Sequence, residues 1–98
     1  MNEISVDELA AIPSAVVIDV REPDEYGDGH VPGARNIPLG EVRDHSAEID
    51  TTGAVYVICQ SGRRSARACE ALASAGIRAV NVAGGTSAWI ESGRSVQS

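Results

Sequence analysis

The order of the predicted elements favours an α/β fold in which helices cover a sheet. Two apolar, β-branched runs, at residues 15–20 and 55–58, are typical of buried strands in a parallel sheet. An alanine-rich run over residues 65–75 has high helix propensity and is followed by Gly76, a residue that commonly ends a helix. Strands that alternate with helices imply right-handed crossovers and a small α/β sandwich.

Length and composition predict a single domain that spans residues 1–98. A chain of this length can build one hydrophobic core without disulfides, but not two. Hydrophobic residues make up 43% of the chain, with no Phe and one Trp, so the core must consist mainly of Val, Ile, Leu and Ala. The initiating Met1 favours a complete small polypeptide, and we expect an acidic domain of this size to be a monomer.

Local signals place the shorter elements of the first half of the chain. Ser5 and Glu8 have the spacing of a capping box, which predicts a first short helix. Asp19 lies at or near the end of the first buried strand, and Pro23 can start a helical turn directly after it.

Several more elements are expected over short segments, namely a strand at 34–37, surface helices within 40–49, a strand at 78–82 and a helix at 86–91. Thr86 or Ser87 is expected to cap this last helix. Residues from Gly93 onward indicate a frayed tail.

The segment that says most about function is the loop from Cys59 to Ser65. It lies between the strand at 55–58 and the alanine-rich helix, so the thiol emerges at a strand's carboxyl end beside a helix N-terminus. Free backbone N–H groups and the helix dipole bind anions there, and Arg63 and Arg64 add positive charge. These groups favour the thiolate and lower its pKa from about 8.5. They would equally stabilise a persulfide on Cys59.

A buried and inert cysteine at the end of a core strand is the alternative interpretation of Cys59. It leaves unexplained why a glycine and two arginines, Gly62, Arg63 and Arg64, follow the thiol so closely. The reactive interpretation is therefore favoured.

Charge and cysteine usage argue against several functional classes. The net charge of -6, with no basic run beyond Arg63 and Arg64, argues against nucleic-acid binding. Cys59 and Cys69 fit neither a disulfide framework nor paired metal-ligand spacing, which indicates a reducing compartment. The amino terminus lacks the features of a signal peptide, and no apolar run approaches the roughly 18 residues of a membrane span. We therefore expect a cytoplasmic protein without a membrane partner.

Five segments spread over nearly the whole chain carry a family resemblance. They are Asp19-Val20-Arg21-Glu22 with Glu25 and Tyr26, Gly29-His30-Val31-Pro32-Gly33-Ala34, Asn36-Ile37-Pro38-Leu39, the Cys59 to Ser65 loop, and Gly84-Gly85 with Trp89. In these segments the chain resembles the single-domain rhodaneses, a family of thiosulfate and persulfide sulfurtransferases. The resemblance implies a rhodanese-like fold with a central, mostly parallel five-stranded sheet and helices on both faces. It implies no metal and no organic cofactor.

The resemblance also implies roles for the residues of the loop. Cys59 matches the nucleophile, which alternates between thiol and persulfide. The residues that match the substrate-binding loop, whose amides surround the persulfide, are Gln60, Ser61, Gly62, Arg63 and Arg64. Among them, Arg63 is expected to meet an anionic donor such as thiosulfate, with a solvated surface arginine as the alternative.

Other residues are expected to support the loop or the fold. Asp19, Arg21 and Ser65 are expected to have structural roles. The resemblance implies a supporting ion pair between Asp19 and Arg64, with direct substrate contact as the alternative role. Three further residues have their own expectations: His30 is a turn residue rather than the base of a Cys-His dyad, Cys69 is a core residue or less plausibly a resolving cysteine, and Trp89 is a packing anchor.

The leading hypothesis is a sulfurtransferase in which Cys59 accepts sulfane sulfur from thiosulfate or a persulfide donor. The acceptor would be cyanide, a thiol or a protein dithiol, and the partner a thioredoxin-like or sulfur-relay protein. The first alternative is a persulfide carrier or regulatory interaction module with poor small-molecule turnover. The second is a Cys-dependent phosphatase or arsenate reductase. It is disfavoured because four residues separate Cys59 from Arg64, whereas the related cell-cycle phosphatases have five.

Overall fold

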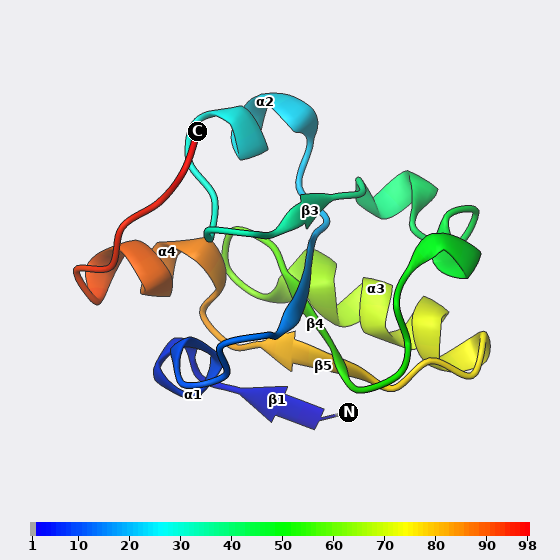
Figure 1. Ribbon diagram of the computed structural model, residues 1–98. Coiled ribbons are helices and arrows are strands. Elements are labelled where there is room, and N and C mark those ends of the chain that lie inside the picture. The colour runs from blue at the N-terminus through cyan, green and yellow to red at the C-terminus, as the bar shows by residue number, and fades with distance from the viewer. Residues whose placement is uncertain (1) are drawn as a thin grey trace.

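The computed structural model describes residues 2–98, which form a five-stranded sheet with helices on both faces. The strands are β1 (Asn2–Ile4), β2 (Val16–Asp19), β3 (Arg35–Asn36), β4 (Val55–Ile58) and β5 (Ala79–Val82). The α-helices are α1 (Val6–Ala10), α2 (Pro23–Gly27), α3 (Arg63–Ser74) and α4 (Gly85–Glu91) (Figure 1). Two short 3-10 helices, η1 (Leu39–Glu41) and η2 (Ser46–Glu48), lie between β3 and β4. The predicted alternation of strands and helices is confirmed.

The strand order in the sheet is β1-β5-β4-β2-β3, and every neighbouring pair is parallel. The sheet is therefore the central parallel sheet that the family resemblance implied. The sequence pattern did not reveal β1, because only one of its three residues, Ile4, is apolar. In the sheet, Asn2 pairs with Val80 and Ile4 with Val82. Since parallel strands end at the same edge, the segments that follow β2, β4 and β5 lie side by side there.

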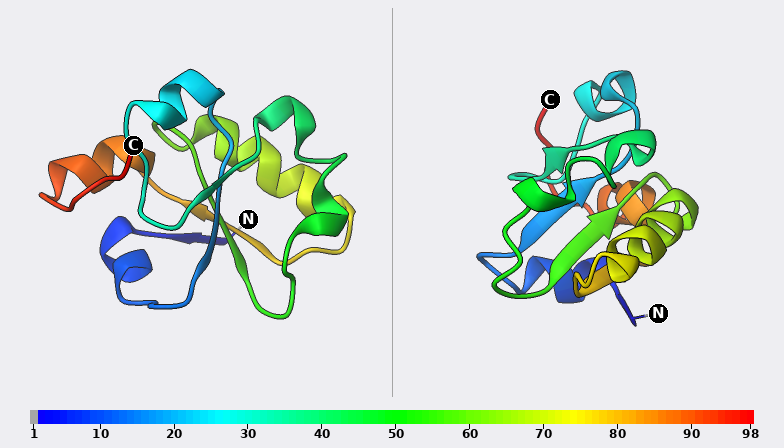
Figure 2. Two further views of the ribbon diagram at one scale, coloured as in Figure 1. Left: turned by 45° about the horizontal axis from the view of Figure 1, so that its top comes forward. Right: turned by 90° about the vertical axis from the view of Figure 1, so that its right-hand side faces the viewer.

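The hydrophobic residues of the strands alternate between two cores, one on each face of the sheet. Val55 and Val57 of β4 pack with Leu72 of α3 on one face. Ile58 packs on the other face in a cluster that includes Trp89 of α4 and residues of α1. The left view of Figure 2 shows α3 on the opposite side of the strands from α1 and α4. Within residues 2–98, none of the helices combines the length and the apolar character that crossing a membrane requires.

The helix starts follow the local sequence only in part. At α1, Ser5 and Glu8 form the predicted capping box. The helix predicted at 86–91 is confirmed as α4, which starts one residue earlier, at Gly85, but the predicted cap is wrong. Gly84, in a left-handed conformation with φ 78°, precedes the helix without a side-chain cap. The first N–H groups of α4 are satisfied elsewhere, by carbonyl groups of the cysteine loop, so neither Thr86 nor Ser87 is needed as a cap.

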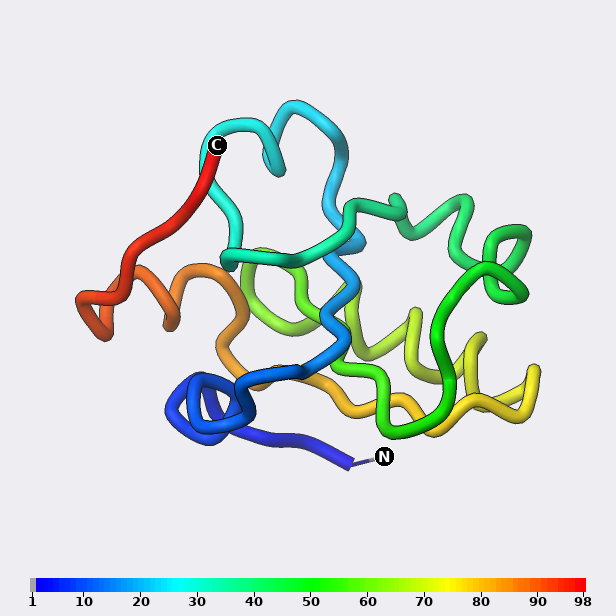
Figure 3. Tube along the Cα trace, viewed as in Figure 1, coloured from blue at the N-terminus to red at the C-terminus, as the bar shows by residue number. Residues whose placement is uncertain are grey.

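The prediction of a frayed tail was also wrong. The backbone of Gln97 pairs with that of His30 in an antiparallel bridge, with N···O distances of 2.8 and 2.9 Å. The indole Nε1 of Trp89 donates a hydrogen bond to the carbonyl of Ser95 at 2.9 Å. Figure 3 shows the C-terminal segment returning to the loop that follows α2. These contacts fix the last residues against the body of the domain.

Gly85 allows the closest approach between α4 and the cysteine loop. A Cβ atom at this position would lie 2.5 Å from the carbonyl oxygen of Cys59 and 2.6 Å from that of Gln60, and the residue has φ +60°. We expect Gly85→Ala to cost about 3 kcal/mol of unfolding free energy, because both the overlap and the left-handed backbone oppose a side chain.

Gly76→Ala is the matched control for this substitution. Gly76 also has a left-handed backbone, φ +81°, but a Cβ there meets nothing within 4 Å. It should cost only about 1 kcal/mol, from the backbone conformation alone. Urea denaturation of both variants measures the two costs, and equal costs would show that the α4 contact with the loop is not tight.

Candidate active site

Cys59 directly follows β4 at the carboxyl edge of the sheet. Its residue surface is 1% exposed, and it packs in the core on the α3 face. The loop that follows turns at Gly62, whose φ of 108° is in the left-handed region, and α3 begins at the next residue. The predicted order of strand, cysteine loop and helix is confirmed, with the helix starting two residues earlier than expected.

Hydrogen-bond donors converge on the sulfur of Cys59. The backbone N–H of Gly62 donates to Sγ at 3.0 Å, and the hydroxyl of Ser65 lies 3.3 Å from it. Burial raises the pKa of the Cys59 thiol, but hydrogen bonds from the Ser65 hydroxyl and from the N–H groups of Ser65, Gly62 and Ser61 outweigh it. The net pKa of Cys59 lies below its ordinary value. The sulfur is thus buried, yet held in surroundings that favour a negative charge.

The N-terminus of α4 holds the carbonyl side of the same loop. The carbonyl of Cys59 accepts hydrogen bonds from the N–H of Thr86 at 2.9 Å and from its hydroxyl at 3.1 Å. The carbonyl of Gln60 accepts from the N–H of Ser87 at 3.1 Å. With these carbonyls turned toward α4, the N–H groups of the loop are free to face the sulfur.

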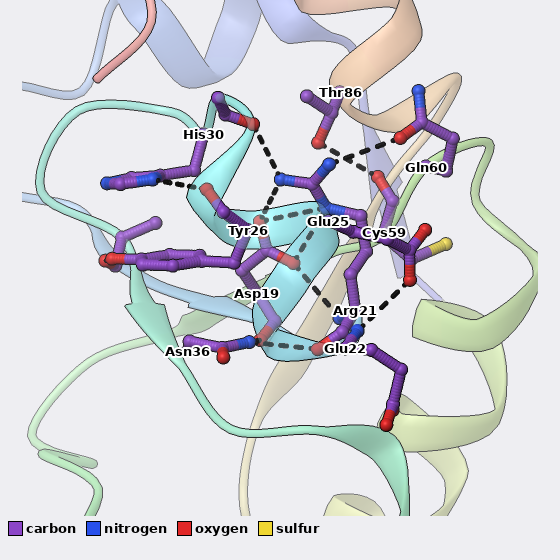
Figure 4. Close-up of polar contacts among 12 residues, drawn as sticks. Asp19, Arg21, Glu22, Glu25, Tyr26, His30, Asn36, Cys59, Gln60 and Thr86 are labelled. Carbon is purple, nitrogen blue, oxygen red and sulfur yellow. Dashed lines mark hydrogen bonds and ion pairs between the residues drawn. The ribbon is translucent and has the colours of Figure 1, made fainter. Parts of the chain in front are cut away.

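A buried arginine, Arg21, links the cysteine loop to β2 and to the loop that follows α2 (Figure 4). Its guanidinium Nη2 lies 2.9 Å from the carboxylate of Asp19 and 2.8 Å from the carbonyl of Gly29. Its Nη1 donates to Oε1 of Gln60 at 3.1 Å, and Nε2 of Gln60 donates to Ser87 at 2.7 Å. The side chain of Gln60 is therefore bound within the protein on both sides.

The expected ion pair between Asp19 and Arg64 is not formed. Asp19 is occupied by Arg21, two residues along the chain, whose Nε also lies 3.1 Å from Oδ1. Arg64 instead makes a two-pronged contact with Glu25 of α2, at 2.6 and 2.8 Å. The predicted pairing of Asp19 with Arg64 was wrong because the guanidinium of Arg21, nearer in the sequence, binds the carboxylate instead.

The contact with Arg64 perturbs Glu25 strongly. Hydrogen bonding from Arg64 lowers the pKa of Glu25 from 4.5 to about 2, and the same contact raises the pKa of Arg64. Both side chains are about one-third exposed, so solvent screens the pair in part. The pair connects the first turn of α3 to α2 across the cysteine loop.

The outer rim of the site contains two exposed residues of the predicted loop, Ser61 and Arg63. Among residues 2–98, no carboxylate lies within ion-pair distance of Arg63. Within the candidate loop, the N–H of Gly62 contacts the sulfur of Cys59, and the Gln60 side chain belongs to the Arg21 network. Arg63 lies at the surface.

The other residues singled out by the sequence lie in the fold as expected. His30 stacks on Tyr26, with ring centroids 3.6 Å apart, and its Nδ1 lies 2.9 Å from the carbonyl oxygen of the same residue. Cys69 is buried in the core, and burial raises the pKa of its thiol to about 11. Trp89 is 8% exposed and packs in the core between α1, α4 and the sheet. The turn role of His30 and the packing roles of the other two are confirmed.

Two residues that connect to the sulfur through Ser65 were not foreseen. Asn81 of β5 contacts the Ser65 hydroxyl, and Glu3 of β1 accepts a hydrogen bond from Asn81 at 3.1 Å. Asn81 interrupts the run Val80, Asn81, Val82, in which a buried polar residue must find a partner. That interruption was the available signal for Asn81, whereas nothing in the sequence pointed to Glu3.

Glu25→Gln tests the pair that replaces the expected one. Since the pKa of Glu25 is depressed in the folded state, its ionisation stabilises the fold above pH 4.5, and this contribution is lost as the pH falls toward 2. We expect the variant to lose about 1 kcal/mol at pH 7, after allowance for solvent screening. Its difference from wild type should shrink between pH 4.5 and 2 in denaturant titrations.

Glu48→Gln serves as the control for this prediction. Glu48 pairs with Arg35 at 2.8 Å, but both side chains are about half exposed. Its loss should leave the unfolding midpoint nearly unchanged. A Glu25→Gln penalty that stays constant from pH 7 to pH 2 would mean that the ion pair contributes nothing.

Comparison with known proteins places the chain in a family. A model of the rhodanese-like domain matches residues 5–92. Thiosulfate sulfurtransferase PspE of Escherichia coli is 46% identical over 70 residues, which are 69% of this chain and 67% of PspE. A sulfurtransferase of Allochromatium vinosum is 33% identical over 98 residues, which cover 95% of this chain and 92% of that protein.

The likeness extends to a solved structure. The crystal structure of a rhodanese-related protein from Thermoplasma volcanium superposes with a TM-score of 0.93 at 37% identity, over 99% of this chain and 98% of that one. The sequence match, the shared fold and the named relatives agree, and they show that this chain belongs to the rhodanese-like domain family, which includes sulfurtransferases.

Proposed function

We propose that the protein is a sulfurtransferase in which Cys59 carries the transferred sulfur as a persulfide. The observation that carries this proposal is the convergence of N–H and O–H donors on Sγ of Cys59 at the carboxyl edge of the sheet. Such donors stabilise the thiolate before transfer, and the N–H groups of the loop can stabilise a negatively charged outer sulfur after it. The domain's family and its sulfurtransferase relatives support the same class of reaction.

The reaction needs only two displacements at sulfur. The Cys59 thiolate attacks the sulfane sulfur of a donor such as thiosulfate, the donor's S–S bond breaks, and sulfite leaves with the electron pair. The product is a Cys59 persulfide anion. A nucleophilic acceptor, cyanide or a thiolate, then attacks the outer sulfur, and the bond to Sγ breaks to restore the Cys59 thiolate. Neither step requires a base, consistent with a His30 ring that is engaged with Tyr26.

The burial of Cys59 favours a second candidate function. With 1% of its surface exposed, Cys59 is shielded from bulk solvent. This shielding would protect a Cys59 persulfide from adventitious small thiols while the domain carries it to a protein partner. A thioredoxin-like or sulfur-relay protein with a reactive thiol is the partner class that fits, in a cytoplasmic setting.

Persulfide formation is the direct test of the proposed function. After incubation with thiosulfate, intact mass spectrometry should show one added sulfur on the wild type and on Cys69→Ala, but none on Cys59→Ala. A wild type that gains no sulfur from thiosulfate or from any protein persulfide would overturn the proposal. Fast single-turnover uptake from a protein persulfide, together with slow thiocyanate formation, would identify the carrier.

Arg63→Ala tests the recognition of anionic donors. Arg63 is exposed at the start of α3 beside the sulfur loop, and it is free of ion pairs among residues 2–98. We expect the Michaelis constant for thiosulfate to rise about 2- to 5-fold, the effect of a screened surface charge, with kcat nearly unchanged. Added salt should diminish the difference from wild type.

Arg78→Ala is the control for the loss of one positive charge. Arg78 is equally exposed but precedes β5, and so lies at the amino-terminal edge of the sheet. Steady-state kinetics should show a wild-type Michaelis constant for this variant. The same increase in both variants would assign the effect to net charge rather than to donor binding.

A further inference from the structure

The hydroxyl of Ser65 lies between two hydrogen-bond acceptors. Ser65 is fully buried, and its Oγ contacts both Oδ1 of Asn81 and Sγ of Cys59, the latter at 3.3 Å. A serine hydroxyl has one hydrogen to donate. Only one of the two acceptors can receive that hydrogen at a time.

The orientation of the Asn81 amide is fixed by its other neighbours. Its Nδ2 donates to the carboxylate of Glu3 at 3.1 Å and to the carbonyl of Gly62 at 3.2 Å. Both of these groups only accept hydrogen bonds, so a flipped amide would place Oδ1 against two acceptors. Asn81 is 2% exposed, so its side chain cannot turn toward solvent. Its Oδ1 must therefore face Ser65.

We propose that Asn81 is a positioning residue for the sulfur site, which competes with Cys59 for the Ser65 hydrogen and thereby sets how readily Cys59 ionises. In the thiol state the contacts are satisfied in series: the Cys59 S–H donates to Ser65, and Ser65 donates to Asn81. When Cys59 loses its proton to solvent, the thiolate draws the Ser65 hydrogen toward sulfur. Asn81 is then left without a donor at a buried oxygen, which is costly.

This competition has a consequence for sulfur transfer, one that rests on the proposed function. In a Cys59 persulfide the negative charge is on the outer sulfur, and the inner Sγ, bonded to carbon and sulfur, is a weak acceptor. Ser65 can return its hydrogen to Asn81 in that state. Asn81 thus disfavours the free thiolate relative to the loaded persulfide, and assists capture of sulfur over its premature loss.

The charged and titratable groups around Cys59 also influence its ionisation and must be kept constant in a test. They are Arg64 and Cys69 of α3, Glu25 of α2, Glu3 of β1, and the Asp19–Arg21 pair after β2. A substitution at Asn81 changes none of these residues, but it also removes the hydrogen bonds that Nδ2 donates to Glu3 and to the carbonyl of Gly62. The contribution of the Ser65 contact must therefore be separated from these two losses by comparison with a variant that lacks the Ser65 hydroxyl.

The test is the pH dependence of Cys59 alkylation by iodoacetamide in the full chain, with the adduct located by peptide mapping. This readout needs no sulfur donor, so it is independent of the thiosulfate experiment. Asn81→Val removes the acceptor and suits a strand between two valines. We expect it to lower the Cys59 pKa and speed alkylation below that pKa by about 2- to 10-fold, the value of one hydrogen bond.

Two further variants separate competition from loosened packing. Asn81→Asp provides a stronger acceptor and also adds a negative charge, and both effects should shift the profile in the opposite direction. The decisive comparison is therefore the next one, which leaves the charge unchanged. In a Ser65→Ala background, Asn81→Val should no longer lower the Cys59 pKa, because the contested hydrogen is gone. Should Asn81→Val fail to fold, Asn81→Ala replaces it with the same expectation. A raised or unchanged pKa in the apolar variant, or the same shift without the Ser65 hydroxyl, would overturn the proposal.

Discussion

The hydrogen bonds between the N-terminus of α4 and the carbonyls of Cys59 and Gln60 are the constraint on which the site depends. A peptide group has its N–H and C=O on opposite sides. When the N–H groups of a loop all face one atom, its carbonyl groups point away and need hydrogen-bond donors elsewhere. Thr86 and Ser87 supply those partners. The close approach needed for this is available because Gly85 has no side chain.

The buried charge of Arg21 supports the same loop from the other side. The buried guanidinium of Arg21 has its charge balanced by Asp19 and its remaining donors directed to Gly29 and Gln60. These partners offset part of the desolvation cost of the buried charge, and the loss of any one of them would be strongly destabilising. Because Gln60 also contacts Ser87, the Arg21 network and the start of α4 hold the same residue of the loop from two sides. This double attachment accounts for the fixed geometry beneath a short, glycine-containing turn.

Much of the fold was predictable because it depends on local pattern. The runs at β2 and β4, the Ser5 capping box and the cysteine loop before α3 all have signals within a few neighbouring residues. The predictions failed where contacts between distant parts of the chain determine the local structure. The start of α4 is set by carbonyls of the cysteine loop, 27 residues earlier, and the C-terminal segment is held by pairing with His30.

The candidate site shows the same division. Cys59 and the donors of its loop could be located from one segment, whereas the partners of the charged groups could not. Sequence spacing does not reveal that Arg21 folds back onto Asp19 and leaves Arg64 to Glu25. Pairing of β5 with β4 and β1 brings Asn81 to Ser65 and Glu3 to Asn81, and no local pattern identifies these partners.

The pairing of β1 with β5 has a consequence for biogenesis. The contact between Glu3 and Asn81 joins residues 78 positions apart, and α4, which orients the cysteine loop, lies wholly after Cys59 in the sequence. Long-range pairing of this kind must wait until both partners have been synthesised. A nascent chain therefore exposes Cys59 as an ordinary thiol, and its reactive environment is assembled only once the residues of α4 have been synthesised.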